Sequence, residues 1–393
     1  MYDVPHLRFP EFSGKWEKHL LGEVGETIIG LTYKPSDVVN KDGIIVFRSS
    51  NIKNGVIDYS DLVRVNKVIK ERIITKENDI LVCARNGSQR LIGKNAIIKK
   101  GDANNTFGAF MMVYRSNDNP FILPLLSTKR YISQVSENLG ARINQITTSD
   151  FNGFEFYFPE NHSERVKISE LFRLLDERIA TQNKIIEKLQ SLIKGLIDDI
   201  ITLKCGQLVA FETLYSKAGE GGTPTTSNTE FYDNGSIPFI KIDDLSNKYL
   251  SANKDYITEL GLKKSSAWLI PTHSIIYSNG ATIGAISINK YPVCTKQGIL
   301  GIVPNTNIDV EFLYYFMQSS YFQKEVERVV TEGTMKTAYL KDINHIKCPI
   351  PDLDRQKEIS HLLSVLSLKE DVERQLLQKY QIQKQYLLRK MFI

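Results

Sequence analysis

Two segments of the chain carry hydrophobic residues at the spacing of a coiled-coil seam. In the first, residues repeat every seven positions at Phe172, Ile179, Ile186, Ile193 and Ile200, followed three positions later by Leu175, Gln182, Leu189, Leu196 and Leu203. This seam lasts about five heptads, which is longer than most helices of globular domains. The second segment keeps the seam at Leu363, Leu366, Leu377, Tyr380, Leu387 and Met391, with interruptions at Glu370, Glu373 and Lys384. The pattern predicts two long helices.

We predict that the two helices pair with each other as a coiled coil. The residues expected to make the pairing are Phe172, Leu175, Ile179, Ile186, Leu189, Ile193 and Leu196 in the first helix, and Leu366, Leu377, Tyr380 and Leu387 in the second. The alternative is that each helix packs only on its own neighbouring domain.

The rest of the chain consists of short alternating or β-branched runs bounded by Gly, Pro and Asn-Gly signals, which are typical of strands. The runs are GIIVFRSS, NDILVCA, KNAIIKK and GAFMMVY before the first helix, and PFIKI, SIIYS, GAISI and GILGIVP before the second. Each portion also has one helical stretch near its end, at about 121–135 and 310–330. We therefore expect two mostly-β domains, each with a helical insertion.

The chain is a tandem repeat. Ile168, Leu171 and Leu175 reappear 191 positions later as Ile359, Leu362 and Leu366, and an apolar run into an Asn-Gly turn ends at Gly87 and again at Gly280. The predicted fold class is α+β: two mostly-β domains (1–160 and 205–352), separated and joined by helical regions (161–204 and 353–393) that pair as an antiparallel coiled coil with pseudo-two-fold symmetry.

Composition and net charge exclude few classes of function. The chain has 393 residues, and its net charge of +5 permits nucleic-acid binding without proving it. The four cysteines lie far apart with no C-x-x-C pair, which predicts neither a disulfide framework nor a zinc site and fits a reducing compartment. No apolar signal core or run of 18 apolar residues occurs, so we expect a cytoplasmic protein without a membrane span.

Catalytic motifs are missing from the sequence. The stretch 87–95 resembles a P-loop, but its glycines are one residue too far apart and Asn95 stands where Ser or Thr must ligate magnesium. Asn119-Pro120-Phe121 is similar to the Asn-Pro-Pro-aromatic loop of adenine methyltransferases but lacks one proline, and a helix N-cap followed by Pro explains it better. The histidines show no metal-ligand spacing. We expect no catalytic residues, no metal and no cofactor bound by this chain.

Several motifs resemble the specificity subunits of type I restriction–modification enzymes. They are Leu7-Arg8-Phe9-Pro10-Glu11-Phe12 with Trp16, Gly221-Gly222-Thr223-Pro224, and the Arg-Gln-Lys-x-Ile start of the second helix at 355–359. The resemblance covers the whole chain, with two departures. The first helix begins with Glu164-Arg165-Val166-Lys167, and the first half has Gly30-Leu31-Thr32 where the second has Gly-Gly-Thr-Pro.

The resemblance implies a non-catalytic reader of double-stranded DNA in the bacterial cytoplasm. Each β-rich domain would read one half of a bipartite site, and the paired helices would space the readers and dock two methyltransferase subunits. Two restriction (motor) subunits would join in the restriction form. S-adenosylmethionine, ATP and Mg²⁺ would be used by these partners. A helix of about 36 residues spans roughly 54 Å, enough to bridge contacts one DNA turn of about 34 Å apart. The alternatives are a helical scaffold that reads no DNA, or a self-contained nuclease or methyltransferase.

DNA contacts require polar and basic side chains on loops beside a rigid sheet. The candidates in the first half are Arg48, Ser50, Asn51, Lys53, Arg85, Asn86, Ser88, Gln89, Arg90, Arg142, Asn144 and Gln145. Those in the second half are Gly222, Thr223, Lys241, Ser278, Asn279, Thr282, Lys296, Gln297, Thr334 and Lys336. For any one of them the alternative is an ordinary solvated turn, and the cluster 85–90 is the strongest.

Overall fold

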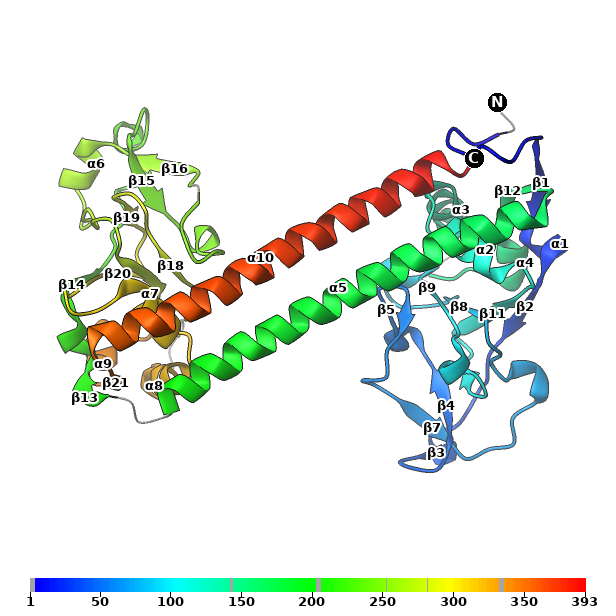
Figure 1. Cartoon of the computed structure of the whole chain (residues 1–393), viewed down its shortest axis with the longest axis horizontal. Coiled ribbons are helices and arrows are strands. Elements are labelled where there is room, and N and C mark those ends of the chain that lie inside the picture. Colours follow the sequence, from blue (N-terminus) through cyan, green and yellow to red (C-terminus); the bar gives the residue numbers. More distant parts are fainter. Residues whose placement is uncertain (1–3, 142–143, 203–205, 252, 281, 332–335) are drawn as a thin grey trace. The chain divides into compact units, whose positions relative to one another are not determined.

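The computed structural model describes residues 4–141, 144–202, 206–251, 253–280, 282–331 and 336–393. Internal contacts divide the chain into unit 1 (residues 1–183 with 376–393) and unit 2 (residues 184–375). Each unit holds a strand-rich domain and part of two long helices, α5 (His162–Thr202) and α10 (Leu353–Lys390) (Figure 1). The predicted combination of strand-rich domains with long helices is confirmed.

Unit 1 is built around a four-stranded antiparallel sheet in the order β2-β11-β8-β9. Its strands are β2 (Glu26–Ile29), β8 (Ile80–Cys83), β9 (Asn95–Ile97) and β11 (Met111–Arg115). All four residues of β8 are buried, because Ile80 and Val82 face one hydrophobic core while Leu81 and Cys83 face another. A strand covered on both faces reads as a continuous apolar run, as ILVC does here.

Smaller sheets complete the unit 1 domain. They are β10-β4-β7-β3, the hairpin β5-β6 and the pair β1-β12. Their strands are β1 (Trp16–Leu20), β3 (Val38–Val39), β4 (Ile44–Phe47), β5 (Ile52–Lys53), β6 (Val56–Ile57), β7 (Val63–Val65), β10 (Thr106–Phe107) and β12 (Glu155–Pro159). Strand β1 pairs antiparallel with β12, which places the first strand of the domain directly beside the strand that leads into α5.

The helical insertion of unit 1 is interrupted rather than continuous. It consists of α2 (Asn119–Leu125), α3 (Lys129–Ala141) and α4 (Thr148–Asn152), and a one-turn helix α1 (Leu21–Val24) lies earlier in the chain. The single helix expected at 121–135 is wrong, because the hydroxyl of Thr128 accepts from the N–H of Tyr131 and starts a new helix. Helix α2 does have Pro in its first turn, but its cap is Asp118 rather than Asn119, whose amide donates to two backbone carbonyls.

Unit 2 repeats this architecture. The order β14-β20-β17-β18 corresponds to β2-β11-β8-β9, β16-β15-β19 to β7-β4-β10, and β13-β21 to β1-β12. The strands are β13 (Gln207–Ala210), β14 (Tyr215–Glu220), β15 (Ile237–Ile240), β16 (Asp255–Ile257), β17 (Ile275–Ser278), β18 (Ile286–Ile288), β19 (Cys294–Thr295), β20 (Ile299–Pro304) and β21 (Lys347–Ile350). The helices are α6 (Glu259–Lys263), α7 (Val310–Phe316), α8 (Ser320–Val329) and α9 (Leu340–Ile343). The helix expected at 310–330 is also divided, because Ser319 caps α8.

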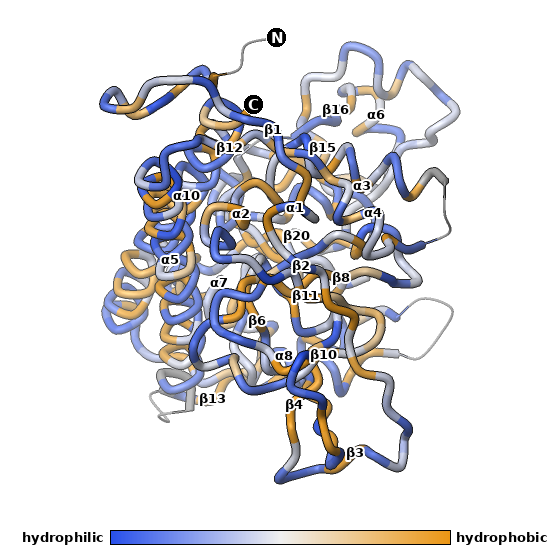
Figure 2. Tube along the Cα trace, turned by 90° about the vertical axis from the view of Figure 1, so that its right-hand side faces the viewer, coloured by the Kyte–Doolittle hydropathy of each residue, from blue (hydrophilic) through white to orange (hydrophobic). Residues whose placement is uncertain are grey.

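The long helices pack against each other within each unit. In unit 1 the beginning of α5 meets the end of α10: the rings of Phe172 and Phe392 lie 5.5 Å apart, Arg178 lies over Tyr380, and Lys384 pairs with Asp176. In unit 2 the end of α5 shares a core with Ile359 and Leu363 from the beginning of α10. In both units the beginning of one long helix packs against the end of the other, so the pairing is antiparallel. Hydrophilic and hydrophobic residues alternate along both helices (Figure 2).

Every residue proposed for helix pairing is buried or half-buried. These residues are Phe172, Leu175, Ile179, Ile186, Leu189, Ile193, Leu196, Leu366, Leu377, Tyr380 and Leu387. The charged residues that interrupt the sequence pattern stay on the same face of α10. Glu373 is buried and pairs with Lys369, and Glu370 pairs with Arg374 at 2.7 Å. These ion pairs allow charged side chains to occupy seam positions.

Both long helices begin with the same construction despite different sequences. Asn161 and Asp352 cap them by accepting from the N–H groups of Ser163 and Arg355. In the first turn of α5, the Arg165 guanidinium donates to Asp118 Oδ1 at 3.0 Å and to the Pro159 carbonyl at 2.7 Å. At the repeat-related position in α10, Gln356 accepts from Asp309 N (2.9 Å) and donates to the Pro351 carbonyl (2.8 Å). Each side chain therefore fastens its helix to the insertion helices of its own domain.

Candidate nucleic-acid interface

Three loops proposed to read DNA meet in unit 1. The 3₁₀ turn at 49–51 follows β4, the turn at 85–90 follows β8, and residues 144–145 precede α4. Asn86 Nδ2 donates to Ser49 Oγ at 2.9 Å, Asn144 Nδ2 donates to the Gly87 carbonyl at 3.3 Å, and the backbones of Arg85 and Gln145 form a β-bridge. These segments were predicted from residue type alone, and the structure brings them together.

The basic side chains of this cluster differ in their electrostatic surroundings. Arg48 pairs with Asp61 at 2.7 Å, and Lys53 pairs with Asp58 at 3.0 Å. The pKa of Asp58 is lowered to about 2 by hydrogen bonds from Ser60 and then from Lys53.

Arg85 and Arg90 are exposed, and neither makes an ion pair with any residue in the described part of the chain. Phosphate or base contacts by these two arginines would break no existing ion pair. Ser88 and Gln89, in the same turn, are also exposed.

The amides of this cluster are committed to the protein itself. Asn51 is fully buried: its Oδ1 accepts from Arg48 N, and its Nδ2 donates to the Asp58 and Asp61 carbonyls. The prediction of DNA contact by Asn51 is therefore wrong, because all three interactions would have to break. Asn86 also holds its own turn by accepting from Ser88 N at 2.9 Å. Ser50 remains exposed.

Phe110 belongs to this cluster but was not among the residues predicted from the sequence. It lies in the turn before β11 and its side chain is 61% exposed. The guanidinium carbon of Arg85 lies 5.3 Å from the centre of its ring. In the sequence, Phe110 belongs to the run GAFMMVY, which we assigned to a strand interior, and the Gly-Ala pair before it was the only signal of a turn.

In unit 2 the exposed candidates are fewer. Lys296 and Gln297 lie in the turn between β19 and β20, and Thr282 and Lys336 are exposed on neighbouring loops. Lys241, which directly follows β15, is exposed but pairs with Asp255 at 2.8 Å. Arg142 and Thr334 lie outside the described residues.

Four predicted contacts at the end of β17 and in the Gly-Gly-Thr-Pro motif are contradicted by burial. Ser278 and Asn279 are buried, and the Asn279 amide donates to the Ala338 carbonyl. Gly222 is buried so tightly that a Cβ there would lie 2.2 Å from Ser266 Oγ. The hydroxyl oxygen of Thr223 is buried as well, so this motif packs loops together instead of facing a ligand.

The three described cysteines are buried, and burial changes their acidity. Burial raises the pKa of the Cys83 and Cys294 thiols to about 11 and that of Cys348 to about 12, which makes them poor nucleophiles. Within the described ranges, no group of three or more His, Cys, Asp and Glu side chains is placed to hold a metal.

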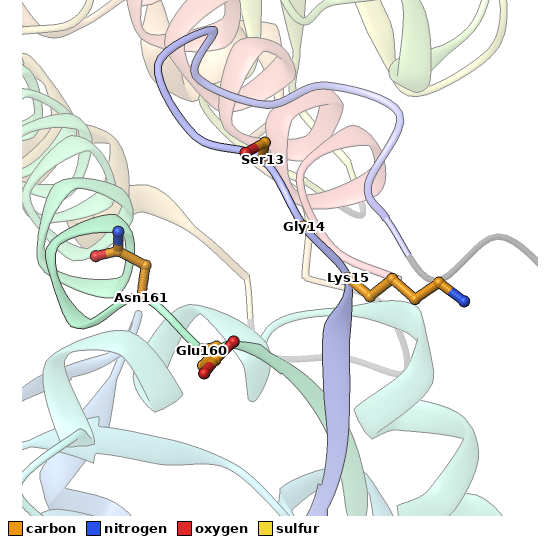
Figure 3. A pocket seen from close by; sticks show the side chains of 5 residues that line it. All are labelled: Ser13, Gly14, Lys15, Glu160 and Asn161. Atoms are coloured by element: carbon orange, nitrogen blue, oxygen red, sulfur yellow. The ribbon is translucent and has the colours of Figure 1, made fainter.

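One pocket in unit 1 is lined by Ser13, Gly14, Lys15, Glu160 and Asn161. The Lys15 side chain points away from the others, so their polar groups do not converge on one point (Figure 3). None of the described helices combines the length and apolar character of a membrane span.

Comparison with known proteins gives one consistent family. The family model described as "Type I restriction modification DNA specificity domain" matches twice, over residues 13–191 and 215–380. A curated relative, the EcoR124I/EcoR124II specificity subunit of Escherichia coli, is 29% identical over 52% of this chain. The match covers only about half of that relative's length (53%).

Two further similarities extend along nearly the whole chain. The putative MjaX specificity subunit of Methanocaldococcus jannaschii is 25% identical over 95% of this chain and 91% of its own. The solved S subunit of a type I restriction–modification system from M. genitalium has a TM-score of 0.62 over 99% of both chains. Its identity of 17% makes this a likeness of fold.

Proposed function

We propose, from the premise that this chain belongs to the type I restriction modification DNA specificity domain family, that its two β-rich domains read the two halves of a bipartite DNA site. The observation that carries the proposal is the repeat itself. One chain presents the same sheet order twice, β2-β11-β8-β9 and β14-β20-β17-β18, with different exposed side chains at the loops. Two copies of one scaffold with different loops are what an asymmetric, two-part sequence requires.

The electrostatics support DNA as the ligand. Arg85 and Arg90 in unit 1, and Lys296 and Lys336 in unit 2, are exposed. None of the four makes an ion pair within the described part of the chain, so these charges are free to neutralise phosphates or to donate to base edges. The remaining exposed candidates, Ser50, Ser88, Gln89, Thr282 and Gln297, add neutral donors and acceptors at the same loops.

We further propose that the paired helices set the number of base pairs between the half-sites and dock the methyltransferase subunits. Along α10, Leu362, Val365, Leu368 and Val372 leave apolar side chains between 47% and 64% exposed. Their spacing of three to four residues puts them on one face of the helix. Such a face on a helix already paired on its other side is suited to a further protein.

In this proposal the chain carries no chemistry of its own. Methylation of adenine and restriction belong to partner subunits, which use S-adenosylmethionine, ATP and Mg²⁺, and the chain decides where they act.

The test is a genome-wide map of methylated adenines in cells that hold the methyltransferase partner with and without this chain. We expect methylation to require the chain and to follow one split motif with a fixed spacer. Methylation that is independent of the chain, or that follows no motif, would refute the reader function and favour a helical scaffold. Methyl transfer by the purified chain alone would refute the assignment of chemistry to the partners.

A further inference from the structure

Arg85 and Phe110 project side by side from two adjacent turns of unit 1. The N–H groups of Ala84 and Arg85 both donate to the Phe110 carbonyl at 3.0 Å, which fixes the two turns against each other. The Arg85 guanidinium lies over the exposed Phe110 ring, at 5.3 Å from its centre. The cation–π contact restrains a long side chain that would otherwise be free, so the pair is held in a defined arrangement.

Unit 2 repeats the backbone hydrogen bonds of Ala84 without this pair. The N–H of Asn279 donates to the Gly298 carbonyl, and the Asn279 carbonyl accepts from Ala338 N. In unit 1, the N–H of Ala84 donates to the Phe110 carbonyl, and the Ala84 carbonyl accepts from Ile146 N. These bonds make Asn279 the counterpart of Ala84, so Gly280 corresponds to Arg85 and Gly298 to Phe110.

The glycines of unit 2 show that Arg85 and Phe110 are not needed for these backbone hydrogen bonds. In unit 2 the two bonds of Asn279 form with glycine at both positions, so the arginine and the phenyl ring are not required for them. A side-chain pair that is dispensable for the scaffold, exposed, and present in only one of the two domains has the properties of a specificity element.

The chemistry of the pair indicates its ligand. The major groove of DNA offers acceptors on purine edges and one apolar group, the 5-methyl of thymine. An exposed phenyl ring beside a guanidinium that makes no ion pair in the described chain matches these two features. The ion-paired Arg48 and Lys53 of the neighbouring loop do not offer the same combination.

We propose that Arg85 and Phe110 form a base-reading unit: Phe110 packs against the 5-methyl group of a thymine, and Arg85 donates to the purine acceptors of the adjacent base pair. This inference rests on the proposed function and makes it specific. It assigns to unit 1 a preference for thymine at one position of its half-site. Unit 2, with Gly280 and Gly298 at the same place, has no such preference there.

The experiment uses the full chain with its methyltransferase partner and DNA duplexes that carry the mapped motif. Each thymine of the two half-sites is replaced in turn by deoxyuridine, which removes only the 5-methyl group. With the unsubstituted chain, we expect one position in one half-site to lose about fourfold in affinity, since a buried methyl-sized group contributes about that much. Phe110→Ala should bind the natural duplex more weakly and lose its sensitivity to deoxyuridine at that position alone.

A second variant and a matched control complete the test. Arg85→Lys keeps the charge but loses the planar donor fork, so its methylation map should relax at the adjacent base pair while the salt dependence of binding stays unchanged. Val68→Ala, 94% exposed in the same unit, should change neither map nor affinity.

The outcomes distinguish a failure of the base-reading unit from a failure of the proposed function. A Phe110→Ala complex that keeps the motif and the deoxyuridine sensitivity, or one that binds every sequence equally more weakly, would overturn the base-reading unit. If the unsubstituted complex methylates no split motif at all, the proposed function itself is refuted.

Discussion

Phe392, which follows α10, should stabilise the strand-rich domain of unit 1. Phe392 is only 7% exposed, and its ring lies 5.5 Å from Phe172, 5.9 Å from Phe121 and 6.3 Å from Trp16, measured between ring centres. Truncating a buried phenylalanine to alanine costs about 3–5 kcal/mol. Phe392 keeps 7% of its surface exposed, unlike the more deeply buried Phe172 and Phe121, so we expect the lower end, about 3 kcal/mol, for Phe392→Ala.

Tryptophan fluorescence can follow this loss in unit 1 alone. The chain has two tryptophans, Trp16 in unit 1 and Trp268 in unit 2, so a Trp268→Phe background leaves Trp16 as the reporter. Urea unfolding followed by Trp16 fluorescence should then show the free energy of unfolding lowered by about 3 kcal/mol. The melting temperature should fall by about 6–12 °C, since each kcal/mol shifts a domain of this size by about 2–4 °C.

The matched control is Ile382→Ala, in the part of α10 that belongs to unit 1 and 59% exposed, which should change stability by no more than about 0.5 kcal/mol. If Phe392→Ala behaves like this control, the end of α10 does not belong to the unit 1 core, and the description of the helix pairing fails.

Three further predictions concern individual side chains. Gln356→Ala should destabilise unit 2 by about 1–3 kcal/mol, since it leaves Asp309 N and the Pro351 carbonyl without their partner. Urea unfolding followed by Trp268 fluorescence in a Trp16→Phe background measures this loss. An unchanged unfolding midpoint would contradict the prediction. Burial raises the pKa of Glu311, but hydrogen bonds from Lys248, Ser364 and Tyr249 outweigh it and hold the pKa below 4.5. The stabilisation from Glu311 should therefore be fully present above pH 4.5 and lost as the pH falls through the lowered pKa; Glu311→Gln should flatten this acid dependence in urea titrations, and an unchanged dependence would speak against it. Iodoacetamide at pH 8 should leave Cys83, Cys294 and Cys348 unlabelled in the folded chain and label them in urea, as read by peptide mass spectrometry; labelling in the folded chain would contradict their raised pKa values.

Periodicity predicted the elements of this fold well where burial dominates. The seam of α5 follows from residues such as Phe172 and Ile186, because a helix buried on one side must repeat apolar residues every three to four positions. The runs ILVC and IIYS, in which every residue is buried, mark strands covered on both faces. Helix breaks were missed because Thr128 and Ser319, which cap α3 and α8, lie inside continuous apolar patterns.

The candidate site was only partly predictable, because residue type does not report where a side chain points. Asn51 and Asn279 have the polar groups of a DNA reader, but both are buried and bind backbone carbonyls. The alignment of the two Asn-Gly turns was also misleading: the hydrogen bonds pair Asn279 with Ala84, two residues away from its apparent partner Asn86. Phe110 was missed because a hydrophobic residue beside a strand is normally part of it.

The central claim is that each domain reads its own half of the DNA site. Exchanging residues 16–159, from β1 to β12, for the corresponding domain of another specificity subunit and mapping methylated adenines tests it directly. The account predicts that one half of the motif changes while the other half stays as it was. A chimera that folds and methylates but changes both halves, or neither, would contradict it.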